Sequence, residues 1–201
     1  MAVLPWGMAS AVRILIINAA LNGRDGNTAA LLKRAADYLQ RRAEIRQLCL
    51  AEAYSYEVVR AELMAAQGIL IGTGTYWDSW SSLLQRLLED ATPDEGEAPW
   101  FAKPIGVLVS MHSVGGKGIV SRLQGVLSTF GCLVPPMSGL VYSYANQRAL
   151  AAPTAQTADL WCLDDVDVVA WNVLTAALKE HDYRKWPVDR TGADDKWMVH
   201  P

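Results

Sequence analysis

Residues 68–90 read GILIGTGTYWDSWSSLLQRLLED and are the stretch that decides the fold. An apolar run at 69–71 is followed by a Gly/Thr turn at 72–75 and by two aromatics, Tyr76 and Trp77. Asp78 and Ser79 then form a cap signal for a helix, whose core face is predicted to carry Leu83, Leu84, Leu87 and Leu88. An apolar run, a Gly-rich turn and a helix start are typical of the strand–loop–helix unit of an α/β sheet. Since ligands bind at the carboxyl ends of strands in such sheets, this turn is a candidate ligand site.

The same alternation extends on both sides of this stretch. Further strands are predicted at 12–18 (VRILIIN), 44–50 and 104–111, and a fifth begins at 132–134, where Pro135 and Pro136 end or bend it. Helices are predicted after residue 28, at 58–67, at 120–130 and at 159–180 from their 3.6-residue apolar spacing. Residues 91–99 are expected to form an acidic surface loop, and residues 142–157 an irregular segment.

Composition narrows the class of protein. The 201 residues are half hydrophobic, which indicates one folded domain, with its core at about 12–181, an arm at 1–11 and a tail at 182–201. The net charge of −3 and the lack of a basic run argue against a nucleic-acid partner. Three distant cysteines without a C-x-x-C argue against disulfides and a zinc site and suit a reducing compartment. The first residues show neither a signal peptide nor a membrane span, so we expect a cytoplasmic protein.

Five strands alternating with helices predict a parallel, doubly wound sheet between two helical layers. For five strands the flavodoxin-like order 2-1-3-4-5 is the first expectation, and flavodoxin is itself the standard example of that order, with FMN at the switch point between the first and third strands. The loops at 19–28, 72–78 and 112–117 would then share one edge of the sheet. The sequence therefore predicts an α/β, flavodoxin-like three-layer sandwich with a ligand crevice at that edge.

Each of the three loops carries residues suited to a ligand, although each also has an ordinary structural interpretation. The first loop ends at a helix start, where Asn27 and Thr28 can cap the helix or donate to an anion. The second offers aromatic rings that can stack on a flat ligand or simply cover the core. The third, His112 to Lys117, has two glycines that allow close backbone contact. The chain contains no dinucleotide or P-loop fingerprint, no catalytic triad recognisable by spacing and no metal-ligand spacing among its histidines.

Three segments of the chain resemble the NAD(P)H-dependent FMN reductases, a flavodoxin-like family. GTGTYWDSWSSLLQRLLED resembles the family motif G-[ST]-P-x-Y-W-G-S-x-S-x-x-L-K-x-x-[LI]-D. KPIGVLVSMHSVGGKG is similar to the family's fourth strand and Gly-rich turn, and IINAALNGRDGNTAALL to its phosphate loop. The resemblance covers about residues 12–180 and implies FMN bound by the three loops, with NADPH or NADH as the electron donor.

The resemblance also implies which residues bind the cofactor. Carried over by position, they are Ala20, Asn22, Arg24, Asn27 and Thr28 at the phosphate, Thr75, Tyr76, Trp77 and Asp78 along the isoalloxazine, and His112, Ser113, Gly115 and Gly116 at its polar edge. The chain departs from the family where Ala20 replaces Ser, Asn22 replaces Arg, Gly74 replaces Pro and Asp78 replaces Gly. Arg24 is the one candidate replacement for the missing arginine. Loss of that charged partner favours FMN held loosely, as an exchanging substrate, and leaves open a member that has lost flavin.

The function expected from these features is NAD(P)H-dependent FMN reduction, with electrons passed on to a small acceptor. A quinone or azo-compound reductase of the same fold and a non-catalytic flavin-binding electron carrier are the alternatives. Small molecules are the expected partners, with no membrane involved. Trp6, Trp186 and Trp197 lie in terminal segments without helical or strand period, which suggests a homodimer or homotetramer.

Overall fold

A computed structural model describes residues 12–151 and 162–185. Five parallel strands form one sheet in the order β2-β1-β3-β4-β5, so the predicted flavodoxin-like topology is confirmed. The strands are β1 (Arg13–Asn18), β2 (Glu44–Cys49), β3 (Gly68–Gly74), β4 (Ile105–Met111) and β5 (Gly139–Ser143). The helices are α1 (Asn27–Leu39), α2 (Tyr56–Ala65), α3 (Ser82–Asp90), α4 (Gly116–Thr129), α5 (Tyr144–Leu150) and α6 (Asp165–Ala177).

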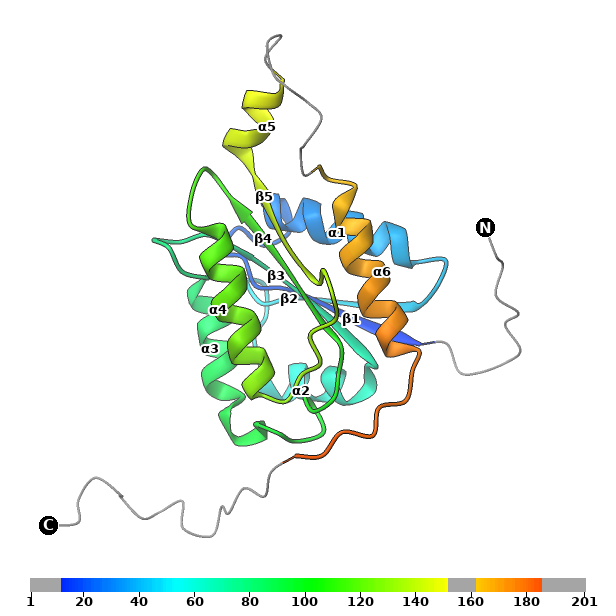
Figure 1. Ribbon diagram of the computed structural model, residues 1–201. Coiled ribbons are helices and arrows are strands. Elements are labelled where there is room, and N and C mark those ends of the chain that lie inside the picture. Colours follow the sequence, from blue (N-terminus) through cyan, green and yellow to red (C-terminus); the bar gives the residue numbers. More distant parts are fainter. Residues whose placement is uncertain (1–11, 152–161, 186–201) are drawn as a thin grey trace, which may run out of the picture.

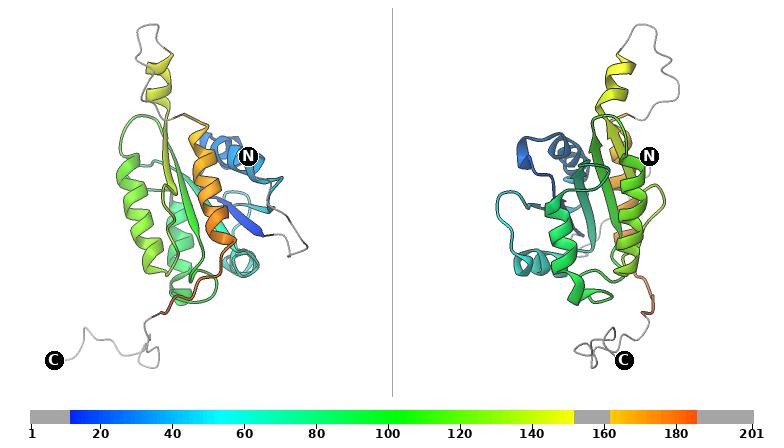
Figure 2. Two further views of the ribbon diagram at one scale, coloured as in Figure 1. Left: turned by 45° about the vertical axis from the view of Figure 1, so that its right-hand side comes forward. Right: turned by 90° about the vertical axis from the view of Figure 1, so that its left-hand side faces the viewer.

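The helices cover the two faces of the sheet in separate layers (Figures 1 and 2). On one face α2, α3 and α4 pack on one apolar cluster, and on the other face α1 and α6 pack on a second. The interior strand β1 supplies both clusters, because Leu15 and Ile17 face one layer while Ile14 and Ile16 face the other. This explains why its sequence is a continuous apolar run rather than an alternating one.

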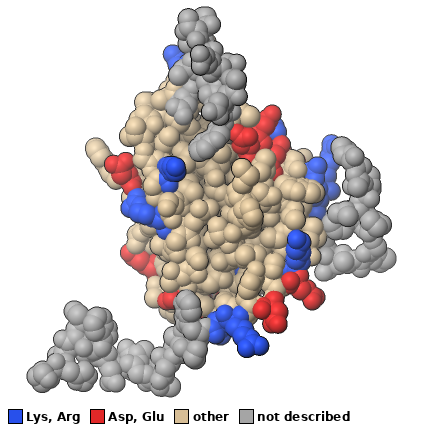
Figure 3. All heavy atoms as spheres, in the orientation of Figure 1, with Lys and Arg blue, Asp and Glu red and all other residues tan. Residues whose placement is uncertain are grey.

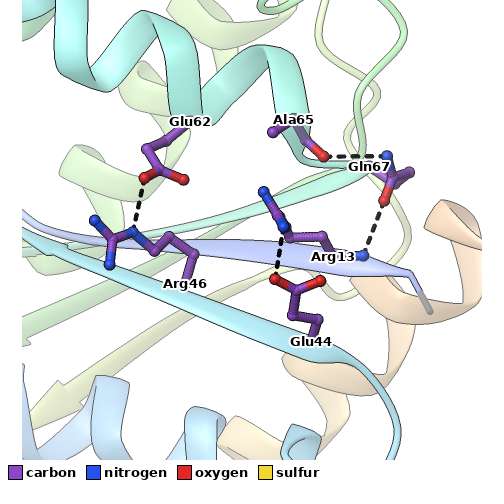
Figure 4. Close-up of polar contacts among 6 residues, drawn as sticks. All are labelled: Arg13, Glu44, Arg46, Glu62, Ala65 and Gln67. Carbon is purple, nitrogen blue, oxygen red and sulfur yellow. Dashed lines mark hydrogen bonds and ion pairs between the residues drawn. The ribbon is translucent and has the colours of Figure 1, made fainter. Parts of the chain in front are cut away.

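The edge strand β2 is protected by charge rather than by burial. Arg13 of β1 lies opposite Glu44 of β2 in the parallel register, and their side chains form an ion pair of 2.7 Å. Arg46 of β2 pairs with Glu62 of α2 at 2.8 Å (Figure 4). Charged side chains along an exposed edge discourage pairing with another strand.

The prediction of the fifth strand was wrong in position. Residues 132–134 make only a single parallel bridge, between Leu133 and Pro104. Pro135 and Pro136 follow, and proline has no N–H to donate to a ladder. The strand that pairs with β4 begins three residues later, at Gly139.

Two other predicted elements shift. Residues 144–150, expected to be irregular, form the short helix α5, which extends beyond the carboxyl edge of the sheet (Figure 1). The last helix begins at Asp165 and ends at Ala177, inside the predicted range 159–180, and residues 159–161 lie outside the described part. The loop at 91–99 is acidic as expected, but its Asp94 is buried and bonded by Arg60 and Tyr56 of α2. The predicted terminal arms also lie outside the described residues, apart from 182–185.

Candidate functional site

A tight turn at the end of β3 replaces the helix start that the sequence suggested. Tyr76 and Ser79 exchange two backbone hydrogen bonds of 2.8 and 2.9 Å. The two residues between them, Trp77 and Asp78, have φ angles of 48° and 60°, the left-handed values of a type I′ turn. The helix α3 therefore starts later, where the hydroxyl of Ser81 accepts a hydrogen bond of 3.1 Å from the N–H of Leu84. Asp78 and Ser79 do not cap the helix.

The first loop is fixed to this turn and to β3. Ala19 donates its N–H to the carbonyl of Gly72 at 2.9 Å, and Leu21 donates to the Tyr76 hydroxyl at 3.1 Å. The side chain of Asn18 closes the loop on itself, since its amide donates to the carbonyl of Gly23 and accepts from the N–H of Ala20. These hydrogen bonds fix the loop after β1 relative to the turn after β3.

The start of α1 lies directly over β3. Gly72 permits this close approach, because a Cβ at that position would come within 2.8 Å of Leu32 and Thr28. The hydroxyl of Thr28 lies 2.7 Å from that of Ser110 at the end of β4, which joins α1 to a third element. The backbone N–H groups of Asn27 and Thr28 have no hydrogen-bond partner among the described residues. They are the unpaired donors expected in the first turn of a helix.

A pocket of about 360 Å³ opens between these elements. Its walls are the predicted residues Ala20, Asn22, Asn27, Thr28, Thr75, Tyr76 and His112, together with Gly26, Gly74, Ser110, Met111 and Tyr144. It lies at the carboxyl ends of β1, β3 and β4, the crevice predicted for this sheet order. A larger cavity, of about 410 Å³, lies on the other side of the first loop, beside β2, but away from that switch point.

Six of the residues assigned by resemblance do not line this pocket: Arg24, Trp77, Asp78, Ser113, Gly115 and Gly116. Arg24 lines the cavity beside β2 instead, and its Nε lies 2.5 Å from a carboxylate oxygen of Glu52. That ion pair raises the pKa of Arg24 and lowers the pKa of Glu52. Arg24 is thus already partnered and does not line the pocket that contains Asn27 and Thr28.

Of the other predicted residues outside the pocket, Asp78 and Gly115 approach each other. Trp77 is fully exposed at the tip of its turn. Gly115 has a φ of 90°, and a Cβ there would clash with the Asp78 side chain, so the turn after β3 rests against the loop after β4. Arg122 of α4 secures this contact, since its guanidinium donates to the carbonyl of Asp78 and lies 5.5 Å from the Trp80 ring.

The sequence reasoning missed Ser110, Met111 and Tyr144. Ser110 and Met111 end a strand that was correctly predicted, so the rule that ligands bind at carboxyl ends was sufficient to find them. Tyr144 follows β5, and its place depended on the strand that was mislocated. Its ring lies 5.5 Å from that of His112.

The chain matches the family model of the NADPH-dependent FMN reductases over residues 12–147. The chain belongs to this family. FMN reductases of this kind bind FMN and take electrons from NAD(P)H, so the chain is a member of a family of flavin-dependent oxidoreductases.

Several solved structures share the fold of this chain. FerB, an NAD(P)H:acceptor flavoenzyme from Paracoccus denitrificans, matches with a TM-score of 0.64 and 18% identity, over 83% of this chain and 97% of that one. A WrbA-like flavodoxin from Agrobacterium tumefaciens matches with a TM-score of 0.61 and 17% identity, over 84% and 98%. An apo NADH:FMN oxidoreductase, EMOB, matches with a TM-score of 0.61 and 16% identity, over 86% and 91%. No curated protein matches the chain.

The volume of the pocket and its neutral hydrogen-bond donors suit FMN. Its volume is in the range of ordinary small-molecule sites. The free N–H groups of Asn27 and Thr28, at the positive end of α1, suit a phosphate, and the ring of Tyr76 offers an apolar surface to a flavin. No Lys or Arg lines the pocket, so a phosphate there would rely on neutral donors and the positive end of the α1 helix.

Within the described ranges, no helix is long and apolar enough to cross a membrane and no cluster of side chains is arranged to hold a metal ion.

Proposed function

We propose that this FMN reductase homologue binds FMN in the pocket at the carboxyl edge of the sheet and passes electrons from a nicotinamide to a small acceptor. The observation that carries the proposal is the pocket itself, whose lining includes the unpaired donors of α1 together with Tyr76 and His112. A bound FMN would supply the hydride chemistry, while the protein binds and orients it.

Each wall of the pocket has a separate role in this proposal. The start of α1 holds the phosphate, because a dianion in a crevice requires donors and a positive dipole. Thr28 and Ser110 keep that helix in register with β4. The backbone and ring of Tyr76 face the flavin, and the Tyr76 hydroxyl is fixed by the N–H of Leu21. Because the pocket offers a phosphate only neutral donors, the flavin is exchangeable rather than permanently bound.

A quinone or azo compound as the final acceptor is the second candidate. Leu21 and Val114 are exposed apolar residues on the loops after β1 and β4, and Tyr144, the first residue of α5, is an exposed aromatic that lines the pocket. An apolar rim beside a flavin site favours an apolar acceptor over a highly charged one.

Steady-state oxidation of NADH and NADPH, with and without added FMN and a benzoquinone, tests the proposal. We expect oxidation well above the rate of free flavin, and a further increase with the quinone. If protein shown to hold FMN gives no rate above free flavin, the chain is a flavin-binding carrier and not a reductase. The ratio of the NADH and NADPH rates identifies the donor.

A further inference from the structure

The cavity of about 410 Å³ between α1 and the edge strand β2 is a second space of ligand size. Side chains alternate along β2, so Gln47 lies on the opposite face of the strand from Arg46, which pairs with Glu62 of α2. One face of β2 thus meets α2, whereas the other face borders the cavity beside α1. FMN bound at the switch point of the sheet leaves this cavity open.

The walls of the cavity combine an apolar surface with two basic side chains. The basic residues are Arg24 and Lys33, and Gln47 adds an amide that has no hydrogen-bond partner among the described residues. The apolar part comes from β1 and α1 and consists of Ile16, Ala29, Ala30 and Leu32. An apolar wall beside a free amide suits a flat heterocyclic ring, and Arg and Lys suit a phosphate.

Both basic side chains are available to a ligand, although each has a carboxylate partner. Arg24 pairs with Glu52 at 2.5 Å and Lys33 pairs with Asp37 at 2.5 Å, while the two basic side chains are 64% and 74% exposed. Ion pairs that are this exposed contribute little to stability, so each cation can exchange its carboxylate for a phosphate at small cost. Asp25 also lines the cavity and opposes an anion there. A ligand therefore needs a phosphate placed at the two cations, and not merely a negative charge.

The rest of the molecular surface offers little general attraction to an anion. The chain has a net charge of −3, and on the face shown in Figure 3 basic and acidic side chains are interspersed rather than gathered into a basic patch. Of the two described cavities beside the first loop, only the one beside β2 has basic residues in its walls. Selection of a phosphorylated ligand therefore depends on local contacts with Arg24 and Lys33.

The two cavities adjoin at the start of α1. Gly26, the residue before this helix, lines both of them. The flavin pocket, at about 360 Å³, is near the lower end of the range for ligand sites, so FMN leaves it no room for a whole dinucleotide as well. A dinucleotide whose nicotinamide reaches the flavin must therefore place its adenosine end outside that pocket. The adjoining cavity is a described space of suitable size.

We propose that the cavity beside β2 binds the adenosine end of the nicotinamide donor, with the 2′-phosphate that distinguishes NADPH from NADH held by Arg24 and Lys33. The inference rests on the proposed function, because it places the electron donor of the same reaction. The apolar side of α1 receives the purine, and the Gln47 amide bonds its polar edge. An arginine at the 2′-phosphate also accommodates NADP in dinucleotide-binding folds of another kind. Arg24 and Lys33 thus determine which donor is used and take no part in the electron transfer.

Binding of adenosine 2′,5′-bisphosphate and of AMP to the full chain, with and without FMN, tests this site without turnover. Calorimetric titration should show the bisphosphate binding at least roughly tenfold more tightly than AMP, because only the bisphosphate carries the second phosphate. Arg24→Ala and Lys33→Ala should each weaken bisphosphate binding by about tenfold. Arg41→Ala is the matched control, since it removes an exposed cation just beyond the other end of α1 and should change nothing.

Glu52→Gln separates ligand binding from a merely structural role of the Arg24–Glu52 ion pair. Like Arg24→Ala, it breaks that pair, but it leaves Arg24 free and removes a competing carboxylate. We therefore expect Glu52→Gln to tighten bisphosphate binding by about threefold, whereas a structural role would make both variants weaken it. In steady-state assays, Arg24→Ala should raise the KM for NADPH by about tenfold and leave kcat and the KM for NADH unchanged.

Cys49 reports where the ligand binds. It lines the cavity and is partly buried, whereas Cys162 is exposed and does not line it. The bisphosphate should slow the alkylation of Cys49 by iodoacetamide and leave the alkylation of Cys162 unchanged, as measured by mass spectrometry of the digested protein.

The outcomes separate this inference from the proposed function. No binding of the bisphosphate, equal binding of AMP, or changes in the same direction for Glu52→Gln and Arg24→Ala would overturn the adenosine site. If FMN still bound and both nicotinamides were oxidised, the proposed function would stand without it. Conversely, protein that binds the bisphosphate as expected but does not oxidise NADPH with added FMN would support the site and overturn the reductase function.

Discussion

Thr28 illustrates how a single side chain joins the site to the fold. It is almost completely buried, and its hydroxyl bonds that of Ser110 across two elements. Thr28→Val keeps the shape but leaves the Ser110 hydroxyl without this partner and loosens the start of α1. We expect FMN affinity to fall by about 1–2 kcal/mol, within the scale of leaving a buried hydroxyl without its hydrogen-bond partner. Titration of flavin-free protein, followed by quenching of flavin fluorescence, measures the change.

Arg24→Ala is the matched control for Thr28→Val. Because Arg24 is ion-paired with Glu52 and lines a different cavity, its loss should alter FMN affinity less than the loss of the Thr28 hydroxyl. The opposite order of effects would show that the phosphate lies at Arg24 and not at the start of α1.

Some of the predicted site residues could be placed from their neighbours in the sequence, whereas others depend on contacts with distant parts of the chain. Asn27, Thr28, Thr75 and Tyr76 were predictable because each follows directly on a strand or opens a helix, and topology alone then brings them together. Arg24 was not placed by such signals, since an ion pair with a residue in a distant loop decides where its side chain points. Trp77 adopts a positive φ angle that a bulky residue disfavours, whereas Asp78 tolerates one, so tertiary contacts of the turn with Arg122 and Gly115 override the local preference at Trp77.

At the scale of elements, sequence reasoning succeeded where burial imposes a clear pattern and failed where the chain is irregular. The strands β1, β3 and β4 are buried on both faces and read as apolar runs. The strand β5 lies at the edge and follows two prolines, so the first apolar residues after α4 were mistaken for it. Its correct start required the pairing with β4, which is a non-local property.

The contact between the loops after β3 and β4 predicts a contrast between two glycines. Gly115→Ala must keep a φ of 90° and displace Asp78, so we expect the free energy of unfolding to fall by about 1–3 kcal/mol. Gly118→Ala, three residues on in α4, has no atom within 4 Å of the new Cβ and should gain about 0.5–1 kcal/mol. Urea unfolding of both variants measures the difference. Equal effects would mean that the two loops do not touch as described.

Lys103 connects the end of α2 to the strand β4, and its burial makes stability depend on pH. Its ammonium donates to the carbonyls of Leu63 and Ala66, and desolvation lowers the pKa of Lys103 from 10.5 to about 8. Since the pKa is lower in the folded state, the unfolded chain binds more protons between these two values. The contribution of Lys103 to stability therefore rises with pH across that window and is lost as the pH falls through 8.

Lys103→Met isolates this effect. From about pH 7.5 to about pH 10, the free energy of unfolding of the wild type should rise relative to that of Lys103→Met. The neighbouring thiol of Cys132 does not obscure the comparison, because burial raises the pKa of Cys132 to about 12 in the folded state and the unfolded chains titrate alike. A difference between the two proteins that stays constant with pH would contradict the assignment.

At the scale of the whole molecule, we propose that the sheet order creates a flavin site whose phosphate end is the start of α1. The three loops that form it are separated in the sequence and meet only because β1, β3 and β4 are neighbours in the sheet. The FMN reductase family, to which the chain belongs, binds FMN, and the residues that line the described pocket include no Lys or Arg.

Titration of the flavin-free protein with FMN and, in parallel, with riboflavin tests this claim most directly. Riboflavin has the same ring and lacks the phosphate, so the ratio of the two affinities isolates the phosphate end of the pocket. We predict saturable quenching with one FMN per chain and at least roughly tenfold weaker binding of riboflavin, as expected for the loss of one or two hydrogen bonds to a charged group. Equal binding of both flavins would contradict the placement of the phosphate at α1, and no quenching by either would contradict the flavin site itself.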